Sequence, residues 1–106
     1  MDKLSDMFER QLILQDHLDV DIYNIEYQKD MVLASIDELM EALREIPWKP
    51  WKKQQKFNKE AFQEEIIDLW HFIINLTLSA EMDANKVYSM FKDKNHINHM
   101  RIEEGY

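Results

Sequence analysis

The sequence of 106 residues contains no cysteine, one glycine and two prolines. Without cysteine, the chain cannot form a disulfide and offers no thiolate as a nucleophile or zinc ligand. A single glycine excludes the glycine-rich loops that bind phosphate in P-loop proteins. So few turn residues also predict long uninterrupted elements, which favours helices over many short strands. We see no signal peptide and no apolar run long enough to cross a bilayer, so a cytoplasmic protein without a membrane partner is expected.

The chain is acidic, with a formal net charge of −8. Sequence-independent binding of nucleic acid needs many Lys and Arg side chains on phosphates, so the charge argues against a nucleic-acid partner. Anionic ligands are not excluded, because metal cations can lie between an acidic protein and an anion. The charge is also uneven, since the basic segment WKPWKKQQKFNK, residues 48–59, stands between two acidic segments.

Apolar residues recur at helical spacing in four parts of the chain. The predicted helices cover about residues 2–18, 22–46 and 59–80, and a fourth begins near Asp83 and stops at Gly105. Pro47 and Pro50 are expected to end the second helix, because proline cannot continue a helix interior. Asn58 is the expected N-cap of the third helix. These elements predict one all-α domain over residues 1–106, a bundle of four or five helices. One copy offers a thin core, so a homo-oligomer is expected.

Two acidic pairs stand on consecutive predicted helices, Glu38 with Glu41 and Glu65 with Asp68. The members of each pair are three residues apart and are therefore neighbours on a helix surface. On a helical wheel, Glu38 and Glu41 lie nearly opposite the apolar stripe of their helix, which is typical of a solvated face. Antiparallel helices can nevertheless turn four carboxylates toward each other, and such a cluster needs a neutralising cation. Oxygen ligands in a chain without cysteine favour Mg²⁺ or Mn²⁺.

The basic segment and the middle of the third predicted helix hold further candidates. Trp48, Trp51 and Lys52 suit stacking on a base and binding of phosphate. Two Trp residues that seal the end of a bundle would give the same pattern, so both interpretations stay open. His71 follows the second acidic pair, and it is expected to form a hydrogen bond within the bundle or to border a pocket.

The C-terminal segment places a cation, an amide and a second cation on one helix face, at Lys94, Asn98 and Arg101. Asparagine offers both a donor and an acceptor, which suits the edge of a base. Lys and Arg suit phosphate. An exposed helix end, where cations stabilise the helix dipole, is the alternative interpretation.

Taken together, these motifs resemble the all-α nucleoside triphosphate pyrophosphatases of the MazG-like superfamily. Within it they look most like the dimeric dUTPases found in phages, some bacteria and trypanosomatids. The superfamily pattern E-x-x-E followed by E-x-x-D appears as ELME and EIID. LQDHLD, residues 14–19, is similar to a segment whose Gln helps to read uracil, with Gln15 as the matching position. PWKPWK and DLWHF also resemble family segments, and the tail, residues 94–106, resembles the signature K-N-x-x-N-x-x-R-x-x-x-G-Y.

The resemblance implies an enzyme that hydrolyses dUTP to dUMP and pyrophosphate. Glu38, Glu41, Glu65 and Asp68 would bind Mg²⁺, for which Mn²⁺ could substitute. Glu38 and Glu41 would be catalytic, and a carboxylate such as Glu38 would deprotonate a magnesium-activated water that attacks the β-phosphorus. The side chains implied to bind the substrate are Gln15, Trp48, Trp51, Lys52, His71, Lys94, Asn98, Arg101 and Tyr106.

Other interpretations stay open at this point. Cytosine differs from uracil by an exocyclic donor in place of a carbonyl acceptor, so a flipped amide at Gln15 or Asn98 would fit dCTP, and a broader house-cleaning pyrophosphatase is also compatible. A non-catalytic helical interaction protein would explain the composition but leave the spacing as coincidence. Family dUTPases are usually longer than this chain, so the pocket walls that their further helices supply are expected either to be missing or to be replaced by the second subunit of a homodimer or homotetramer.

Overall fold

The computed structural model describes residues 1–105 and shows, within that range, four helices and no strand. The helices are α1 (Lys3–His17), α2 (Ile25–Arg44), α3 (Lys59–Ser79) and α4 (Ala84–Glu103). The all-α prediction is confirmed. The predicted second helix was too long at both ends, because α2 begins only after the cap at Asn24 and ends three residues before Pro47.

Short acidic or amide side chains cap the N-terminus of each helix. Asp2, Asn24, Asn58 and Asp83 each accept a hydrogen bond from the backbone N–H three residues later, at donor–acceptor distances between 2.7 and 3.1 Å. Such a cap satisfies one of the helix's free N–H groups and stabilises it by about 1 kcal/mol. The prediction of Asn58 as an N-cap is confirmed.

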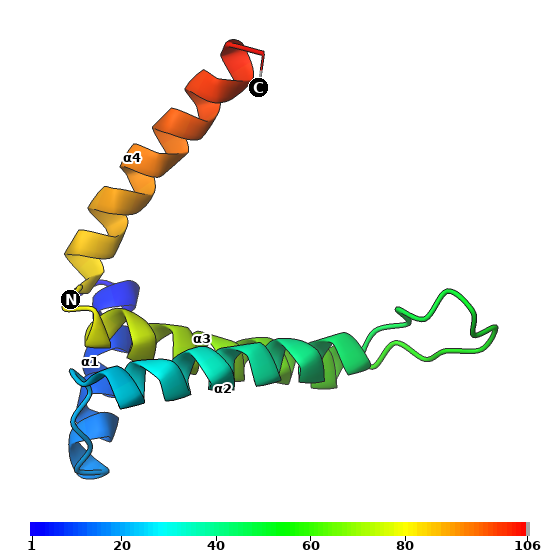
Figure 1. Cartoon of the computed structure of the whole chain (residues 1–106), viewed down its shortest axis with the longest axis horizontal. Coiled ribbons are helices and arrows are strands. Elements are labelled where there is room, and N and C mark those ends of the chain that lie inside the picture. The colour runs from blue at the N-terminus through cyan, green and yellow to red at the C-terminus, as the bar shows by residue number, and fades with distance from the viewer. Residues whose placement is uncertain (106) are drawn as a thin grey trace.

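Helices α2 and α3 form a long antiparallel hairpin, which provides most of the packing between helices (Figure 1). Three contacts fix its register. Gln28 Nε2 donates to the Ser79 carbonyl, Asn75 Nδ2 points at Met31 Sδ, and Asn58 N donates to the Glu45 carbonyl. The loop between the two helices extends beyond the far end of the hairpin (Figure 1).

Helix α1 crosses one end of this hairpin and packs against α3, whereas α4 projects away from it (Figure 1). The small core lies where α1, the end of α3 and the start of α4 meet. Phe8, Ile74 and Ala84 are buried there, and Leu4, Leu78 and Val87 pack around them. Beyond Val87, every described residue of α4 is exposed. The last helix is therefore anchored only by its first turn.

The apolar stripe of α2 faces outward within one copy of the chain. Most of this stripe is exposed, namely Val32, Leu33, Ile36, Leu39 and Met40. The opposite face packs on α3 instead, and its buried residues are Ser35 and Ala42. On a helical wheel Glu38 lies opposite this stripe, and of the two alternatives, a solvated face or a carboxylate cluster, the structure supports the cluster for Glu38.

The chain as a whole is more open than a compact fold. Its radius of gyration is 17.2 Å, whereas a compact chain of this length has about 13 Å. No large side chain among the described residues is completely buried. Within residues 1–105, none of the helices combines the length and apolar character that crossing a membrane requires.

Candidate metal centre and adjoining cavity

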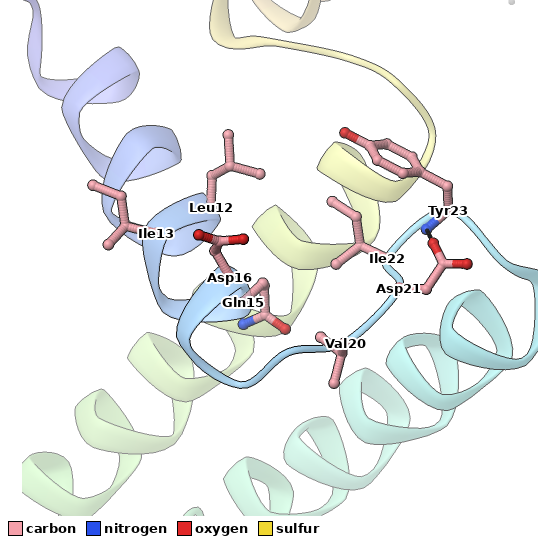
Figure 2. Close-up of a pocket in the computed structure, with 8 residues that line it drawn as sticks. All are labelled: Leu12, Ile13, Gln15, Asp16, Val20, Asp21, Ile22 and Tyr23. Atoms are coloured by element: carbon pink, nitrogen blue, oxygen red, sulfur yellow. Dashed lines mark hydrogen bonds between the residues drawn. The ribbon is translucent and has the colours of Figure 1, made fainter.

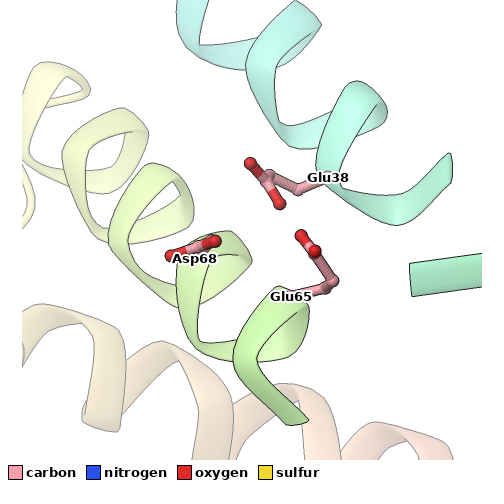
Figure 3. Close-up of side chains that lie close together, drawn as sticks. All are labelled: Glu38, Glu65 and Asp68. Atoms are coloured by element: carbon pink, nitrogen blue, oxygen red, sulfur yellow. The ribbon is translucent and has the colours of Figure 1, made fainter. Parts of the chain in front are cut away.

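Three of the four predicted acidic ligands meet between α2 and α3. Glu38 of α2 and Glu65 and Asp68 of α3 each place a carboxylate oxygen within 4.8 Å of the other two (Figure 3). Glu65 and Asp68 share a face of α3 because they are three residues apart. Glu38 reaches them because its helix turns the small residues Ser35 and Ala42 toward α3, which lets the two backbones approach closely.

Two oxygens of this cluster are buried without a partner. Glu38 Oε2 and Glu65 Oε2 are both inaccessible and accept no hydrogen bond. A buried carboxylate oxygen that lacks a partner is costly, because it has lost its hydration without compensation. This arrangement is what a bound cation would relieve.

The carboxylates also raise one another's pKa. Burial raises the pKa of Glu38, and the charges of Glu41 and Asp68 raise it further, whereas its contact with Glu65 lowers it. The pKa of Glu65 is raised first by its contact with Glu38. Like charges at this separation favour protonation unless a cation neutralises them.

The ligand set fits a hard divalent cation. Around an octahedral Mg²⁺, oxygens at about 2.1 Å from the ion are about 3 Å apart when adjacent and about 4.2 Å apart when opposite. The observed group lies within 4.8 Å, so small rotations of the carboxylates would bring all three onto one ion. An all-oxygen set matches Mg²⁺ or Mn²⁺ rather than a thiophilic metal.

Glu41, the fourth predicted ligand, lies beside this group of three and not within it. Its pKa is raised chiefly by a hydrogen bond and by the charge of Glu65, so the two side chains are neighbours. Glu41 therefore borders the acidic cluster, in a position from which a second ion or a bridging water could be held.

A cavity of about 330 Å³ lies between α1 and α3, one helical turn from the acidic cluster. Met7, Arg10, Ile67, Trp70 and Ile74 line it together with Gln11 and His71. Ile67 also borders an open groove that contains Asp68, so the cavity and the cluster share a wall of α3. His71 is three residues after Asp68 and therefore lies on the same helix face.

Two buried amides behind this cavity were not predicted from the sequence. Gln11 Nε2 donates to Asn75 Oδ1 at 2.8 Å, and Gln11 Oε1 is 2.8 Å from His71 Nδ1. Both amide residues are only 5% exposed. The signal for Asn75 was present, since it is the one amide in the apolar run FIINLTL. Gln11 was not singled out, because Gln15, one turn later, was the residue that matched the family segment.

Gln15 itself lies elsewhere. It is buried and accepts a hydrogen bond of 2.8 Å from the Tyr27 hydroxyl. It borders a different cavity, of about 450 Å³, at the junction of α1 with the loop to α2 (Figure 2). The structure therefore brings Gln11, rather than Gln15, into contact with His71, and a role for Gln15 in substrate binding stays a prediction.

The predicted aromatic and cationic residues of the loop gather at the end of the hairpin. Trp48 and Trp51 pack edge to face with ring centroids 5.7 Å apart. Gln55 binds the backbone of Lys49 and Lys52 and holds this turn together. Trp48 and Lys52 line a cavity of about 300 Å³ whose other cations are Arg44, Lys49 and Lys56. Such a cavity suits an anion.

The residues predicted on α4 are not brought to the acidic cluster within one copy of the chain. Lys94, Asn98 and Arg101 are exposed on the projecting part of the helix (Figure 1). Tyr106, also predicted to bind substrate, lies outside the described residues. The binding roles of these four residues stay predictions.

Comparison with known proteins places this geometry in context. A family model described as dUTPase matches residues 3–89. The dCTP pyrophosphatase of Enterobacteria phage T4 is 28% identical over 100 residues, an alignment that covers 74% of this chain and 58% of that protein. The dCTP pyrophosphatase of Enterobacteria phage LZ5 is 30% identical over 71 residues, which cover 56% of this chain and 41% of that protein.

The chain thus spans about half the length of the curated relatives that it matches. No solved structure matches it. The all-helical fold agrees with the MazG-like pyrophosphatase superfamily that the motifs resemble. Because the family model covers most of the sequence, including both acidic pairs, the chain belongs to the dUTPase family.

Proposed function

We propose that the chain is a divalent-metal-dependent pyrophosphatase acting on pyrimidine deoxynucleoside triphosphates. The observation that carries this proposal is the convergence of Glu38, Glu65 and Asp68, with two buried oxygens that lack a partner. The family match and the two relatives named dCTP pyrophosphatase support it. The reaction would release pyrophosphate and leave the nucleoside monophosphate. The sequence predicts dUTP as the substrate, and the relatives' names support dCTP equally.

The acidic residues would take distinct parts. Glu38, Glu65 and Asp68 would hold Mg²⁺, or Mn²⁺ in its place, with Glu41 beside them. When bound, the metal supplies positive charge that neutralises phosphate oxygens and lowers the pKa of water. Glu38 is the proposed general base, because it is the carboxylate of α2 that faces Glu65 and Asp68 across the shared site. Its contact with Glu65 orients the carboxylate toward the shared site.

The rest of the nucleotide would extend along α3. Asp68 and His71 are one turn apart, or about 5 Å along the helix axis. That separation suits phosphates at the acidic cluster and a base in the cavity next to Trp70 and His71. Lys52, Lys94 and Arg101 remain the proposed phosphate ligands.

Replacing the proposed general base tests this assignment. We expect Glu38→Gln to lower magnesium-dependent pyrophosphate release by about 10³-fold or more, because both a metal ligand and a base are lost. The measurement is a pyrophosphate-release panel over dUTP, dCTP, dTTP, dATP, dGTP and UTP, with and without Mg²⁺. Glu64→Gln, one residue from Glu65 but exposed and outside the cluster, is the matched control and should retain turnover.

Two results would count against the proposal. Full turnover by Glu38→Gln would show that Glu38 has no part in the mechanism. Absence of pyrophosphate release from every nucleotide by the unaltered chain would favour a non-catalytic interaction protein instead. A broad profile over all six nucleotides would move the assignment from a pyrimidine enzyme to a general house-cleaning one.

We also propose that a second copy of the chain covers the outward stripe of α2. The stripe is apolar over several turns and uncovered, the core is small, and the radius of gyration exceeds that of a compact chain. A homodimer, or a homotetramer built from it, would bury these side chains. It would also allow Lys94, Asn98 and Arg101 of one copy to reach the acidic cluster of the other, which they do not reach in their own chain.

A further inference from the structure

A one-way chain of hydrogen bonds leads from the hairpin to the cavity beside the acidic cluster. It runs from Met31 on α2, through Asn75 on α3 and Gln11 on α1, to His71 on α3. The two amides are buried, and neither has another side-chain partner among the described residues. Of these four hydrogen-bonded residues, only His71 is exposed, and it lines the cavity.

The thioether of Met31 determines the direction in which these hydrogen bonds are donated. Asn75 Nδ2 lies 3.7 Å from Met31 Sδ, and a thioether accepts hydrogen bonds weakly but cannot donate. If Asn75 were flipped, its carbonyl oxygen would face that sulfur with no donor, and a buried acceptor would be left unsatisfied. Asn75 therefore presents Oδ1 to Gln11, and Gln11 must donate a hydrogen bond to it from its NH₂ group.

The same logic fixes the proton on the histidine. With Nε2 of Gln11 engaged by Asn75, only the acceptor Oε1 is left for His71 Nδ1, at 2.8 Å. His71 Nδ1 must then carry a hydrogen and donate it. In the neutral ring the other nitrogen, Nε2, is a bare acceptor. It is the one ring nitrogen left free to meet a ligand in the cavity.

We propose that Met31 and Asn75 are positioning residues that hold His71 as an acceptor, and that the cavity therefore selects a base with an amino group at its edge, cytosine, over uracil. Cytosine carries an exocyclic NH₂ donor where uracil carries a carbonyl oxygen. An acceptor nitrogen that faces this exocyclic position forms a hydrogen bond with the NH₂ group of cytosine and meets the carbonyl oxygen of uracil lone pair to lone pair. A site that leaves a polar group unpaired rejects the wrong ligand. The inference rests on the proposed function, and it narrows that proposal to dCTP.

The tautomer can be observed directly, without turnover. The full chain, labelled with ¹⁵N-histidine, would be studied at pH 8 by long-range ¹H–¹⁵N correlation, with His71→Gln used to assign the resonance. We expect the Nδ1–H tautomer at His71, although a free imidazole prefers Nε2–H. Addition of dCMP should shift His71 Nε2 more than the same concentration of dUMP. An Nε2–H signature, or an equal or larger shift with dUMP, overturns the inference.

Two variants separate positioning from a merely structural role. In Met31→Gln the new amide can donate as well as accept, so the hydrogen bonds through Asn75 and Gln11 can run in either direction. We therefore expect a mixture of His71 tautomers. In Asn75→Asp both oxygens can only accept, so Gln11 must still donate to them, and the Nδ1–H tautomer should persist. If Met31→Gln fails to fold, Asn75→Asp still decides, because a change of tautomer in that variant contradicts the one-way chain.

Turnover then distinguishes this inference from the proposed function. We expect kcat/KM for dCTP to exceed that for dUTP by about tenfold or more, and the ratio to fall toward one in Met31→Gln while Asn75→Asp keeps it. A preference for dUTP overturns the inference and leaves the pyrophosphatase proposal standing. If neither nucleotide is hydrolysed, the pyrophosphatase proposal fails, and the shifts with dCMP and dUMP still show which base the cavity prefers.

Discussion

At the scale of single residues, Glu38 is the side chain on which the acidic cluster depends. It is the only member of the group of three that comes from α2, and one of its oxygens is buried without a partner. Its position costs stability in the metal-free chain, because like charges face one another in a partly buried site. In the proposed enzyme the same features would prepare it to bind a cation and to accept a proton. Function and instability would then have one origin.

This predicts a specific pH dependence for the metal-free chain. The pKa values of Glu38, Glu41 and Glu65 are raised above the ordinary value of 4.5. The folded chain thus binds these protons more tightly than the unfolded chain does. Their contribution to stability is fully present below that value and is lost as the pH rises through the raised pKa values.

Thermal unfolding in EDTA measures this effect. We expect Tm to fall between pH 5 and pH 8, with a smaller fall in Glu38→Gln, which removes one charge from the cluster. Added Mg²⁺ should raise Tm more at pH 8 than at pH 5, because protons compete with the metal for the same oxygens. An identical pH slope in Glu38→Gln and the unaltered chain would show that the cluster is not the cause.

At the scale of elements, the closeness of α2 and α3 depends on small side chains on one face of α2. Ser35 and Ala42 lie one turn before and one turn after Glu38 and are both buried. Small residues at such positions let helix backbones approach, whereas larger ones hold them apart. The apolar stripe on the other face of α2 contributes nothing to this contact within one chain.

A larger side chain at Ala42 should therefore impair the metal centre without touching a ligand. We expect Ala42→Leu to cost about 1–3 kcal/mol of stability by overpacking and to weaken Mg²⁺ binding about tenfold or more, because Glu38 moves away from Glu65. Calorimetric titration with Mg²⁺ measures the affinity, and circular dichroism checks the helix content. Ala42→Ser, which stays small, is the control. Unchanged Mg²⁺ affinity in a folded Ala42→Leu chain would disprove the account.

At the scale of the whole molecule, two features support the proposed second copy. The hairpin exposes an apolar face, and most of α4 contacts nothing else among the described residues. Monomeric proteins rarely expose large contiguous apolar surfaces. A second copy laid against α2 is the simplest cover, because it would supply a self-complementary surface of the same chemistry.

A charge in the middle of the stripe tests this assembly. We expect the unaltered chain to have twice its 12.9 kDa mass in solution, or four times that mass for a tetramer. Leu39→Asp should dissociate it to the single-chain mass and lower turnover, because an unpaired carboxylate would be buried in the interface. Light scattering coupled to size-exclusion chromatography gives the mass. Leu39→Met keeps an apolar side chain of similar volume and should leave the assembly intact. A monomeric unaltered chain would contradict the proposed second copy.

Sequence patterns predicted the helices and the proximity of Glu65 to Asp68, because both depend on local spacing. Helix caps and the three-residue spacing of Glu65 and Asp68 are properties of a single helix. The direction of the α2 stripe was not predictable in this way, since it depends on what covers the helix. Gln11 and Asn75 were missed because their significance arises only where α1 crosses α3. The direction in which α4 projects likewise depends on its contacts with other helices, which the pattern of its own residues does not reveal.

Helix α3 is the one element shared by the acidic cluster and the cavity. The cluster needs α2 as its second wall, and the cavity needs α1. In the proposed enzyme, changes in α1 would therefore alter which nucleobase is accepted while the cleavage machinery stays as it is. Changes in α2 would do the reverse, except at Met31, which the proposed hydrogen-bond chain links to the cavity. The choice of nucleotide would then diversify by changes in one helix at a time.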